Sequence, residues 1–417
     1  MHSHAHDDTP AQISRRIRLI LTGVMTALFT LTVAAMIALW PNADEIPAKR
    51  PYLAEGATLL YGEVVATYPA EQGGHIVVDL DETGERVLVN TSPQVPASEI
   101  SVGDNVTVID LPAGYSGSGE TNYVFVDFQR GTPLLVLALL FVVVVVAVAR
   151  RKGAAALVGL IGALACIWLF LLPALTAGRN PLLVALTAAS AIMFIVVYLA
   201  HGISVKTTTA LLGTFAGVAV VVIGAWIAIP AVHLTPRIHD EMAWLESSVP
   251  GINLAGVLLC GMVLAGVGVL NDVTITQASA VWELRAAEPH ATRFEVFTRA
   301  MRIGRDHIAS TVYTIAFAYV GSALALLTLT TMMDYTLDTL LTFEDIAEEL
   351  VPTFVASIAL VLTIPLTTAI GAWLAGGAAA EQHLDAVTAA TEPLADDTAS
   401  ASPATGHSAS PAEYTER

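Results

Sequence analysis

The strongest constraint on the fold is a series of long apolar segments that recurs along most of the chain. Each approaches or exceeds the roughly 20 residues that an α-helix needs to cross about 30 Å of hydrocarbon. Helices satisfy their own backbone polar groups in that environment, so each segment is predicted to be a transmembrane helix. The eight segments are 19–40, 132–149, 154–174, 181–200, 207–229, 252–270, 308–330 and 350–375. We therefore predict an α-helical polytopic membrane protein with about eight transmembrane helices.

Composition supports this class and argues against several others. Hydrophobic residues make up 55% of the chain and charged residues only 13%, which is too little charge to cover a soluble protein of 417 residues. No basic stripe is present, so no nucleic-acid partner is predicted. The sequence contains no HExxH, no GxSxG and no paired cysteines at metal-binding spacing. We predict neither an enzyme nor a cofactor or metal site.

The basic residues predict how the chain crosses the membrane. Arg15, Arg16 and Arg18 precede the first apolar segment, which is too long for the apolar part of a cleaved signal peptide. Residues 18–40 are therefore predicted to be a signal-anchor helix that starts in the cytoplasm. Eight spans then place both termini inside, with 13 Lys and Arg residues on the cytoplasmic side and 6 outside. The predicted location is the cell (inner or plasma) membrane.

Between the first and second apolar segments lies one sizeable polar block, residues 41–131, predicted to be extracytoplasmic. Hydrophobic and polar residues alternate in HIVVDL and RVLVN, and the turn sequence DETG separates them as in a hairpin. The five predicted strands are 57–67, 74–80, 85–90, 105–110 and 122–128. This number of short strands predicts a small all-β domain, an OB-like barrel or alternatively a sandwich. A structural or partner-docking role is expected for it.

The remaining divisions follow from composition. Residues 132–377 are predicted to form a seven-helix transmembrane domain. The polar segments 1–17 and 378–417 have almost no large apolar side chains, so both are predicted to be disordered in the cytoplasm.

Polar residues are concentrated at the end of the sixth apolar segment. Asp272, Thr276, Ser279 and Glu283 are spaced 4, 3 and 4 residues apart and so share one helical face. Asn271 lies beside them, where the segment reaches the inner interface. Thr274 is followed three residues later by Gln277, which is the pattern of a capping box. This pattern suggests a helix break near Asn271, with the free N–H groups of a new helix N-terminus available to a ligand.

A similar stripe follows in the seventh segment. His307, Thr311 and Thr314 lie at helical spacing, with Asp306 on an adjoining face. Ionisable groups at membrane depth usually mark ion, proton or substrate routes. Imidazole ionises nearest to neutral pH, so His307 is the candidate proton carrier. The full set of path candidates is Asn271, Asp272, Thr276, Ser279, Glu283, Asp306, His307, Thr311 and Thr314. The alternative is structural: both aspartates lie just outside the hydrocarbon, and the hydroxyls only pack between helices.

A basic segment connects the two stripes. Residues 291–305 combine aromatic side chains with arginines, a composition typical of an amphipathic helix on the anionic inner leaflet. The predicted membrane-surface residues are Arg293, Arg299, Arg302 and Arg305.

This part of the chain also resembles a known family. GVLNDVTITQASAVWEL (268–284) and GRDHIASTVYTIAFAYVG (304–321) resemble the two motifs of the YibE/F-like multi-pass membrane proteins. The matching positions are Gly268, Asp272, Ser279, Glu283, Gly304, Arg305, Asp306, Tyr319 and Gly321. The resemblance covers roughly residues 130–375. It implies a multi-pass membrane protein and supplies no catalytic residues.

Two hypotheses of function follow. The first is transport of a small solute or ion along the polar faces of the sixth and seventh helices. The second is a membrane scaffold or sensor whose β domain binds an envelope protein. The predicted partners are the lipid bilayer, a small solute or ion, that envelope protein and, as an open alternative, a second copy of the chain in a homo-oligomer.

Overall fold

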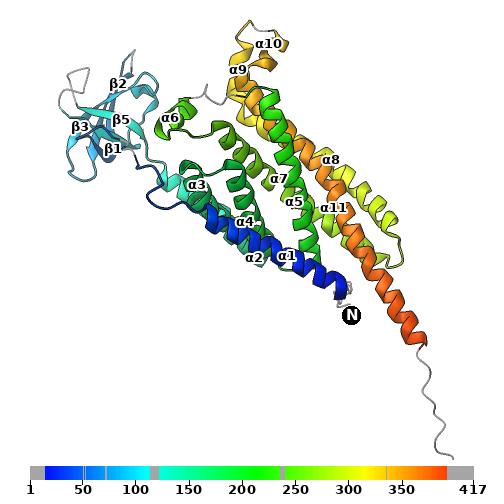
Figure 1. Cartoon of the computed structure of the whole chain (residues 1–417). Coiled ribbons are helices and arrows are strands. Elements are labelled where there is room, and N and C mark those ends of the chain that lie inside the picture. Colours follow the sequence, from blue (N-terminus) through cyan, green and yellow to red (C-terminus); the bar gives the residue numbers. More distant parts are fainter. Residues whose placement is uncertain are drawn as a thin grey trace, which may run out of the picture.

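The structure, a computed structural model, describes residues 15–49, 51, 53–70, 73–112, 122–234, 240–334 and 336–391. It consists of a small β-barrel and a bundle of long helices (Figure 1). Residues 1–14 and 392–417 lie outside the described residues, so the predicted disorder of these ends stays a prediction.

The barrel confirms the predicted all-β domain. Its strands are β1 (Thr58–Ala70), β2 (Gly73–Leu80), β3 (Arg86–Thr91), β4 (Asn105–Asp110) and β5 (Tyr123–Phe128), with a 3-10 turn at Ala97–Glu99. They close in the order β1-β2-β3-β5-β4, antiparallel except for the β3–β5 pair. Because side chains alternate across a strand, every second residue faces the barrel interior. Val64, Ile76, Val78, Val89 and Val108 are fully buried there.

Hydrogen bonds fix the end of the last barrel strand just before the first long helix that follows it. Gln129, just beyond β5, donates from its side chain to the Val106 carbonyl at 3.0 Å. Arg130 donates to the Asp127 carboxylate at 2.6 Å, and this hydrogen bond lowers the pKa of Asp127. The strand end is therefore tied to β4 immediately before the chain enters the bundle.

The helix α1 (Arg15–Leu39) corresponds to the predicted signal anchor. The helix α2 (Gly131–Cys166) continues through a π-helical turn (Ile167–Leu171) into α3 (Leu172–Thr176), and it contains a break. Arg150 has φ 52° and ψ −130°. A Cβ on Gly153 would lie 2.5 Å from the carbonyl oxygen of Val145, although eight residues of straight helix rise about 12 Å. The chain therefore folds back at Arg150, between the predicted segments 132–149 and 154–174.

The other helices follow the predicted order. They are α4 (Pro181–His201), α5 (Val205–Ala231), α6 (Asp240–Ser248), α7 (Leu254–Ala287), α8 (Arg293–Ser322), α9 (Leu324–Thr331), α10 (Leu337–Thr342) and α11 (Glu344–Thr391). Among the described residues, six helical stretches are long and apolar enough to cross a membrane, or seven if α8 and α9, bent by 65°, form one span. The predicted count was eight because the sequence divides Gly131–Thr176 into two segments, whereas the helical range runs through the break.

Three details differ from the sequence prediction. The helix α7 is continuous through Asn271, so the suggested break is wrong. The amphipathic helix predicted at 291–305 and the seventh span are one helix, α8, because Gly304 packs against Gln277 and Ile364 rather than ending the helix. Residues 378–391, predicted to be disordered, extend α11.

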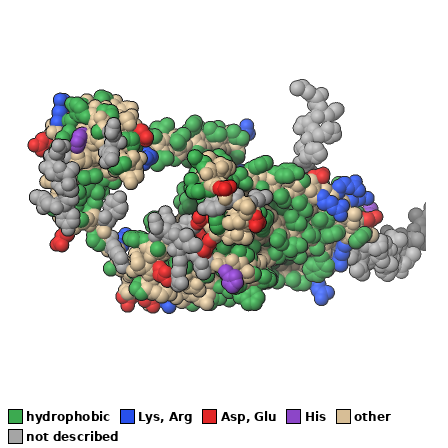
Figure 2. Space-filling model, turned by 90° about the horizontal axis from the view of Figure 1, so that it is seen from above, with side chains coloured by type: hydrophobic (Ala, Val, Ile, Leu, Met, Phe, Trp, Pro, Cys, Tyr) green, Lys and Arg blue, Asp and Glu red, His purple; other side chains and the backbone are tan. Residues whose placement is uncertain are grey.

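The surface is consistent with insertion in a bilayer. Hydrophobic side chains cover the sides of the bundle, and basic side chains gather mainly at the end away from the barrel (Figure 2). Ion pairs connect segments predicted on the same side: Arg179 with Glu45 at 2.7 Å, and Lys206 with Glu283 at 3.5 Å. We refer to the end with Lys206 and Glu283 as the basic end.

Candidate functional site

The centre of the bundle is a polar core built by α5, α7 and α11. Thr214 and Thr274 are fully buried and share a hydrogen bond of 2.7 Å across the α5–α7 contact. The indole N–H of Trp282 donates to Thr209 at 3.2 Å in the same contact. We call this set the threonine core; its members are Thr209, Thr214, Thr274, Gln277, Trp282, Thr363, Thr367 and Thr368. Hydroxyls between apolar helices of this kind stabilise helix packing in a membrane.

Gln277 connects three helices within this core. Its side-chain amide donates to the Ala300 carbonyl of α8 at 2.9 Å and to the Thr368 hydroxyl of α11 at 2.8 Å. The spacing of Thr274 and Gln277 predicts a cap for a restarted helix. Both side chains instead lie on the inward face of an unbroken α7, so they hold the bundle together.

The threonine core also fixes the depth of Asp272. Since α5 and α7 are antiparallel and Thr214 contacts Thr274, Asp272 lies level with about residue 216, near the middle of α5. About ten residues of α5 separate this level from Lys206 at the basic end. Asp272 therefore lies level with the middle of the candidate membrane span α5.

Asp306 and His307 lie near the same depth on α8. Gly304 packs against Ile364 and the Gln277 side chain, and the two polar residues follow it within one helical turn. By the rise of a helix, Asp306 and Asp272 differ in depth by roughly 5 Å or less. His307 has a buried Nε2 atom with no hydrogen-bond partner among the described residues.

The predicted residues of α7 face away from the threonine core. Asp272, Thr276 and Glu283 are exposed on the bundle surface, while Asn271 and Ser279 are partly buried. Asn271 Oδ1 is buried without a hydrogen-bond partner in the part of the chain that the structure describes. Gly261, Ala265 and Gly268 continue the exposed face along the same helix. We call Gly261, Ala265, Gly268, Asp272, Thr276, Ser279 and Glu283 the α7 stripe.

On α8 the predicted residues are also at the surface. Asp306 and Thr314 are exposed, and His307 and Thr311 are partly buried, with the Thr311 hydroxyl donating to the His307 carbonyl at 2.9 Å. Asp272 of the α7 stripe and Asp306 of α8 are thus on neighbouring helices at nearly one depth.

Comparison with family models decides the relationship of this chain to known proteins. A model of the YibE/F-like protein family matches residues 137–377, more than half of the chain. The chain belongs to the YibE/F-like family. Comparison with curated proteins and with solved structures gives no match.

The YibE/F-like region contains the whole threonine core and both polar stripes, whereas α1 and the barrel lie before it. Its four predicted membrane-surface arginines, Arg293, Arg299, Arg302 and Arg305, are all exposed on α8. Arg299 forms an ion pair with Glu288 of the α7–α8 connection. Their position between the basic end and Asp306 fits arginines that extend toward lipid headgroups.

The sequence did not indicate a cavity that the structure contains. A cavity lies between α1 and the YibE/F-like region, lined by α1, α4, the start of α5 and the last turns of α7. Its walls come from segments far apart in the sequence, so no local motif marks it. One pattern in the sequence could have indicated this cavity: Arg18, Thr22, Met25 and Phe29 are spaced along one face of α1.

Proposed function

We propose that this YibE/F-like protein transports a small ion or solute across the membrane along the polar surfaces of α7 and α8. The observation that carries the proposal is the depth of Asp272 and Asp306, two carboxylates at nearly one level in the membrane-spanning part of the bundle. An aspartate at the centre of a membrane helix costs roughly 2.5–3.5 kcal/mol, so such residues are usually retained for a path or a partner.

The chemistry of the stripes favours a cation or a proton. The ionisable groups within about 5 Å of this depth are the two carboxylates, the imidazole of His307 and the exposed guanidinium of Arg305. The Nε2 atom of His307 has no partner among the described residues. Carboxylates and imidazole are the groups that relay protons and coordinate small cations in membrane transporters. Hydroxyls of Thr276 and Thr314 extend the polar surface along each helix.

The polar stripes are open to one side in a single chain. A carboxylate is poorly solvated by acyl chains, so the proposal includes a cover for the stripes, for which a second copy of the chain is the simplest candidate. In such a homo-oligomer the small residues Gly261, Ala265 and Gly268 would permit close approach of another helix.

Reconstitution of the full chain tests the proposal. Proteoliposomes that contain a dye for protons, sodium or potassium are exposed in turn to a gradient of the matching ion. The wild-type protein is expected to dissipate at least one gradient faster than liposomes without protein. If the inserted, folded protein dissipates none of the three gradients faster than liposomes without protein, cation or proton transport is refuted.

The second candidate, a scaffold or sensor, is favoured by the position of the barrel outside the YibE/F-like region. It makes the opposite prediction: deletion of residues 52–128 removes function in cells, while substitutions on the helix stripes are tolerated. Measuring both sets of variants in one cellular assay separates the two functions.

A further inference from the structure

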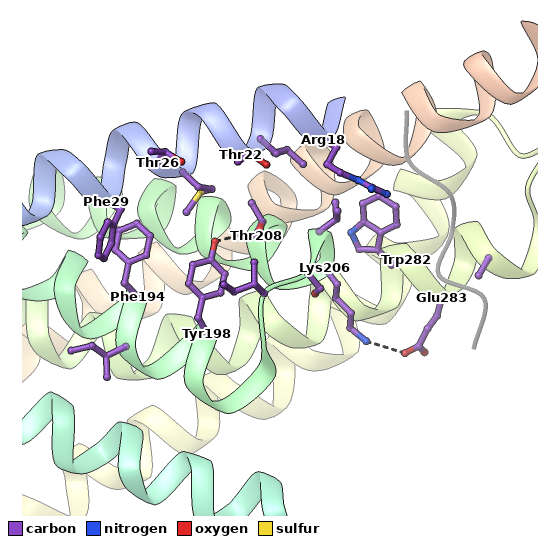
Figure 3. A pocket seen from close by; sticks show the side chains of 17 residues that line it. Arg18, Thr22, Thr26, Phe29, Phe194, Tyr198, Lys206, Thr208, Trp282 and Glu283 are labelled. Atoms are coloured by element: carbon purple, nitrogen blue, oxygen red, sulfur yellow. Dashed lines mark hydrogen bonds and ion pairs between the residues drawn. The ribbon is translucent and has the colours of Figure 1, made fainter. Parts of the chain in front are cut away.

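The cavity beside α1 combines a charged end with an apolar interior. Its volume is about 1130 Å³, above the roughly 300–1,000 Å³ of typical small-molecule pockets. Arg18, Lys206 and Glu283 lie at one end, and Phe29 and Phe194 lie at the other (Figure 3). A ligand that fits both ends must be an amphiphile.

The charged end is suited to an anion. Arg18 and Lys206 line it, and the N-terminus of α5 points into it with Ser204, Val205 and Lys206. Ser204 caps the N–H of Thr207 at 3.1 Å. The N–H groups of Val205 and Lys206, the first two residues of α5, have no intrahelical acceptor. Glu283 is the acidic residue among the lining side chains. Its ion pair with Lys206 is long, at 3.5 Å. Two cations and a positive helix end therefore outweigh one carboxylate.

The other end is closed and apolar. Phe29 and Phe194 meet edge to face with ring centroids 5.3 Å apart. One turn further along α1, Thr32 and Ser190 share a hydrogen bond of 2.6 Å that joins α1 to α4. Leu21, Met25 and Ile195 line the interior between the two ends. An acyl chain placed here would fill the space between α1 and α4 up to the point where Phe29 and Phe194 meet.

We propose that this cavity binds an anionic phospholipid, with the headgroup phosphate at Arg18, Lys206 and the α5 N-terminus, and an acyl chain between α1 and α4. Basic pockets between membrane helices bind anionic headgroups in this manner. The two cations at this end favour a headgroup with a net negative charge. The apolar interior favours a lipid over a soluble anion. Bound lipid would join α1 to the YibE/F-like region.

The test measures lipid binding to the purified full chain by native mass spectrometry. Phosphatidylglycerol and phosphatidylcholine with identical acyl chains are compared, since only the first has a net negative headgroup. Each basic residue near an anionic headgroup contributes roughly fivefold in affinity. Phosphatidylglycerol is therefore expected to bind roughly 25-fold more tightly than phosphatidylcholine.

Variants locate the headgroup. Arg18→Gln and Lys206→Gln are each expected to weaken phosphatidylglycerol binding roughly fivefold, while Lys206→Arg retains it. Arg16→Gln is the matched control, because Arg16 lies on α1 but does not line the cavity. Glu283→Gln should tighten binding by releasing Lys206. Unchanged affinity in both Arg18→Gln and Lys206→Gln, or equal binding of the two lipids, overturns the proposal.

A second pair of variants tests the acyl chain. Thr26 lines the cavity at the α1 surface, whereas its neighbour Ala27 does not. Thr26→Trp is expected to weaken both lipids at least tenfold, and Ala27→Trp neither. Equal effects of the two substitutions would show that the acyl chain does not lie in this cavity. If millimolar inorganic phosphate displaces bound phosphatidylglycerol, the charged end is a site for a free anion, and the proposal of a lipid site is overturned.

Discussion

Asp272→Asn is expected to reduce cation or proton flux by more than tenfold in proteoliposomes, and Asp306→Asn to have a similar effect. Both substitutions keep the size and hydrogen-bonding shape of the side chain but remove the charge that binds or relays the ion. Stability should not fall, because an ionised carboxylate at membrane depth is itself costly. The thermal unfolding temperature of each variant is therefore measured beside its flux.

The matched control is Asp334→Asn, which changes an exposed aspartate between α9 and α10, outside both stripes. It should leave flux at the wild-type rate. If Asp272→Asn and Asp306→Asn transport as fast as Asp334→Asn, the two carboxylates are not part of a path. If their flux falls only together with thermal stability, they act by holding the bundle.

Gly217→Leu is expected to lower the free energy of unfolding by about 3 kcal/mol or more, since overpacking a tight core forces its neighbours to move. A Cβ at Gly217 would lie 2.3 Å from Thr363 Oγ1 and 2.9 Å from Leu270 Cδ1. The Thr363 hydroxyl cannot turn away freely, because it donates to the Ala359 carbonyl at 2.6 Å. Denaturation of the purified protein in detergent measures the loss.

A graded series and a control make this result interpretable. Gly217→Ala should be milder than Gly217→Leu, since alanine adds one methyl group and has higher helix propensity than glycine. Gly23→Leu on α1 is the control, because nothing lies within 4 Å of a Cβ at Gly23. A melting temperature of Gly217→Leu within about 2 °C of wild type would show that α5 and α11 are not packed as described.

The parts of the fold that local patterns determine were predictable from the sequence. Alternation of residues and the DETG turn located all five strands, because side-chain direction in a strand depends only on position. Apolar run length located the spans for the same reason. The closure β1-β2-β3-β5-β4 and the fold-back at Arg150 agree with the predicted barrel and with the predicted separation of 132–149 from 154–174.

Facing and depth were harder to predict. Polar residues at helical spacing look alike whether they face the bundle centre or its surface, so Thr274 and Gln277 were interpreted as a cap. Their contacts with Thr214 and Thr368 exist only once α5 and α11 are placed beside α7. The arginine-rich segment 291–305 was likewise predicted to be separate from the span at 308–330, but α8 is continuous through both.

The cavity beside α1 needed the most tertiary information. Arg18 and Lys206 are far apart in the sequence, and nothing in either neighbourhood indicates that they lie at the same cavity. The register that places Asp272 of α7 level with the middle of α5 comes from one hydrogen bond between Thr214 and Thr274. The two candidate sites therefore depend on how the helices pack. The helices themselves depend on local sequence, which is why they could be predicted.

The most direct test of the proposed path is the water accessibility of the polar stripes in the membrane. Single cysteines replace Thr276, Thr314 or Phe317 in a chain whose buried Cys166 and Cys260 are changed to alanine. A charged, membrane-impermeant thiol reagent is expected to label positions 276 and 314 much faster than position 317, an exposed apolar residue of α8. Labelling of all three positions at the same slow rate would place the stripes against lipid and contradict a path.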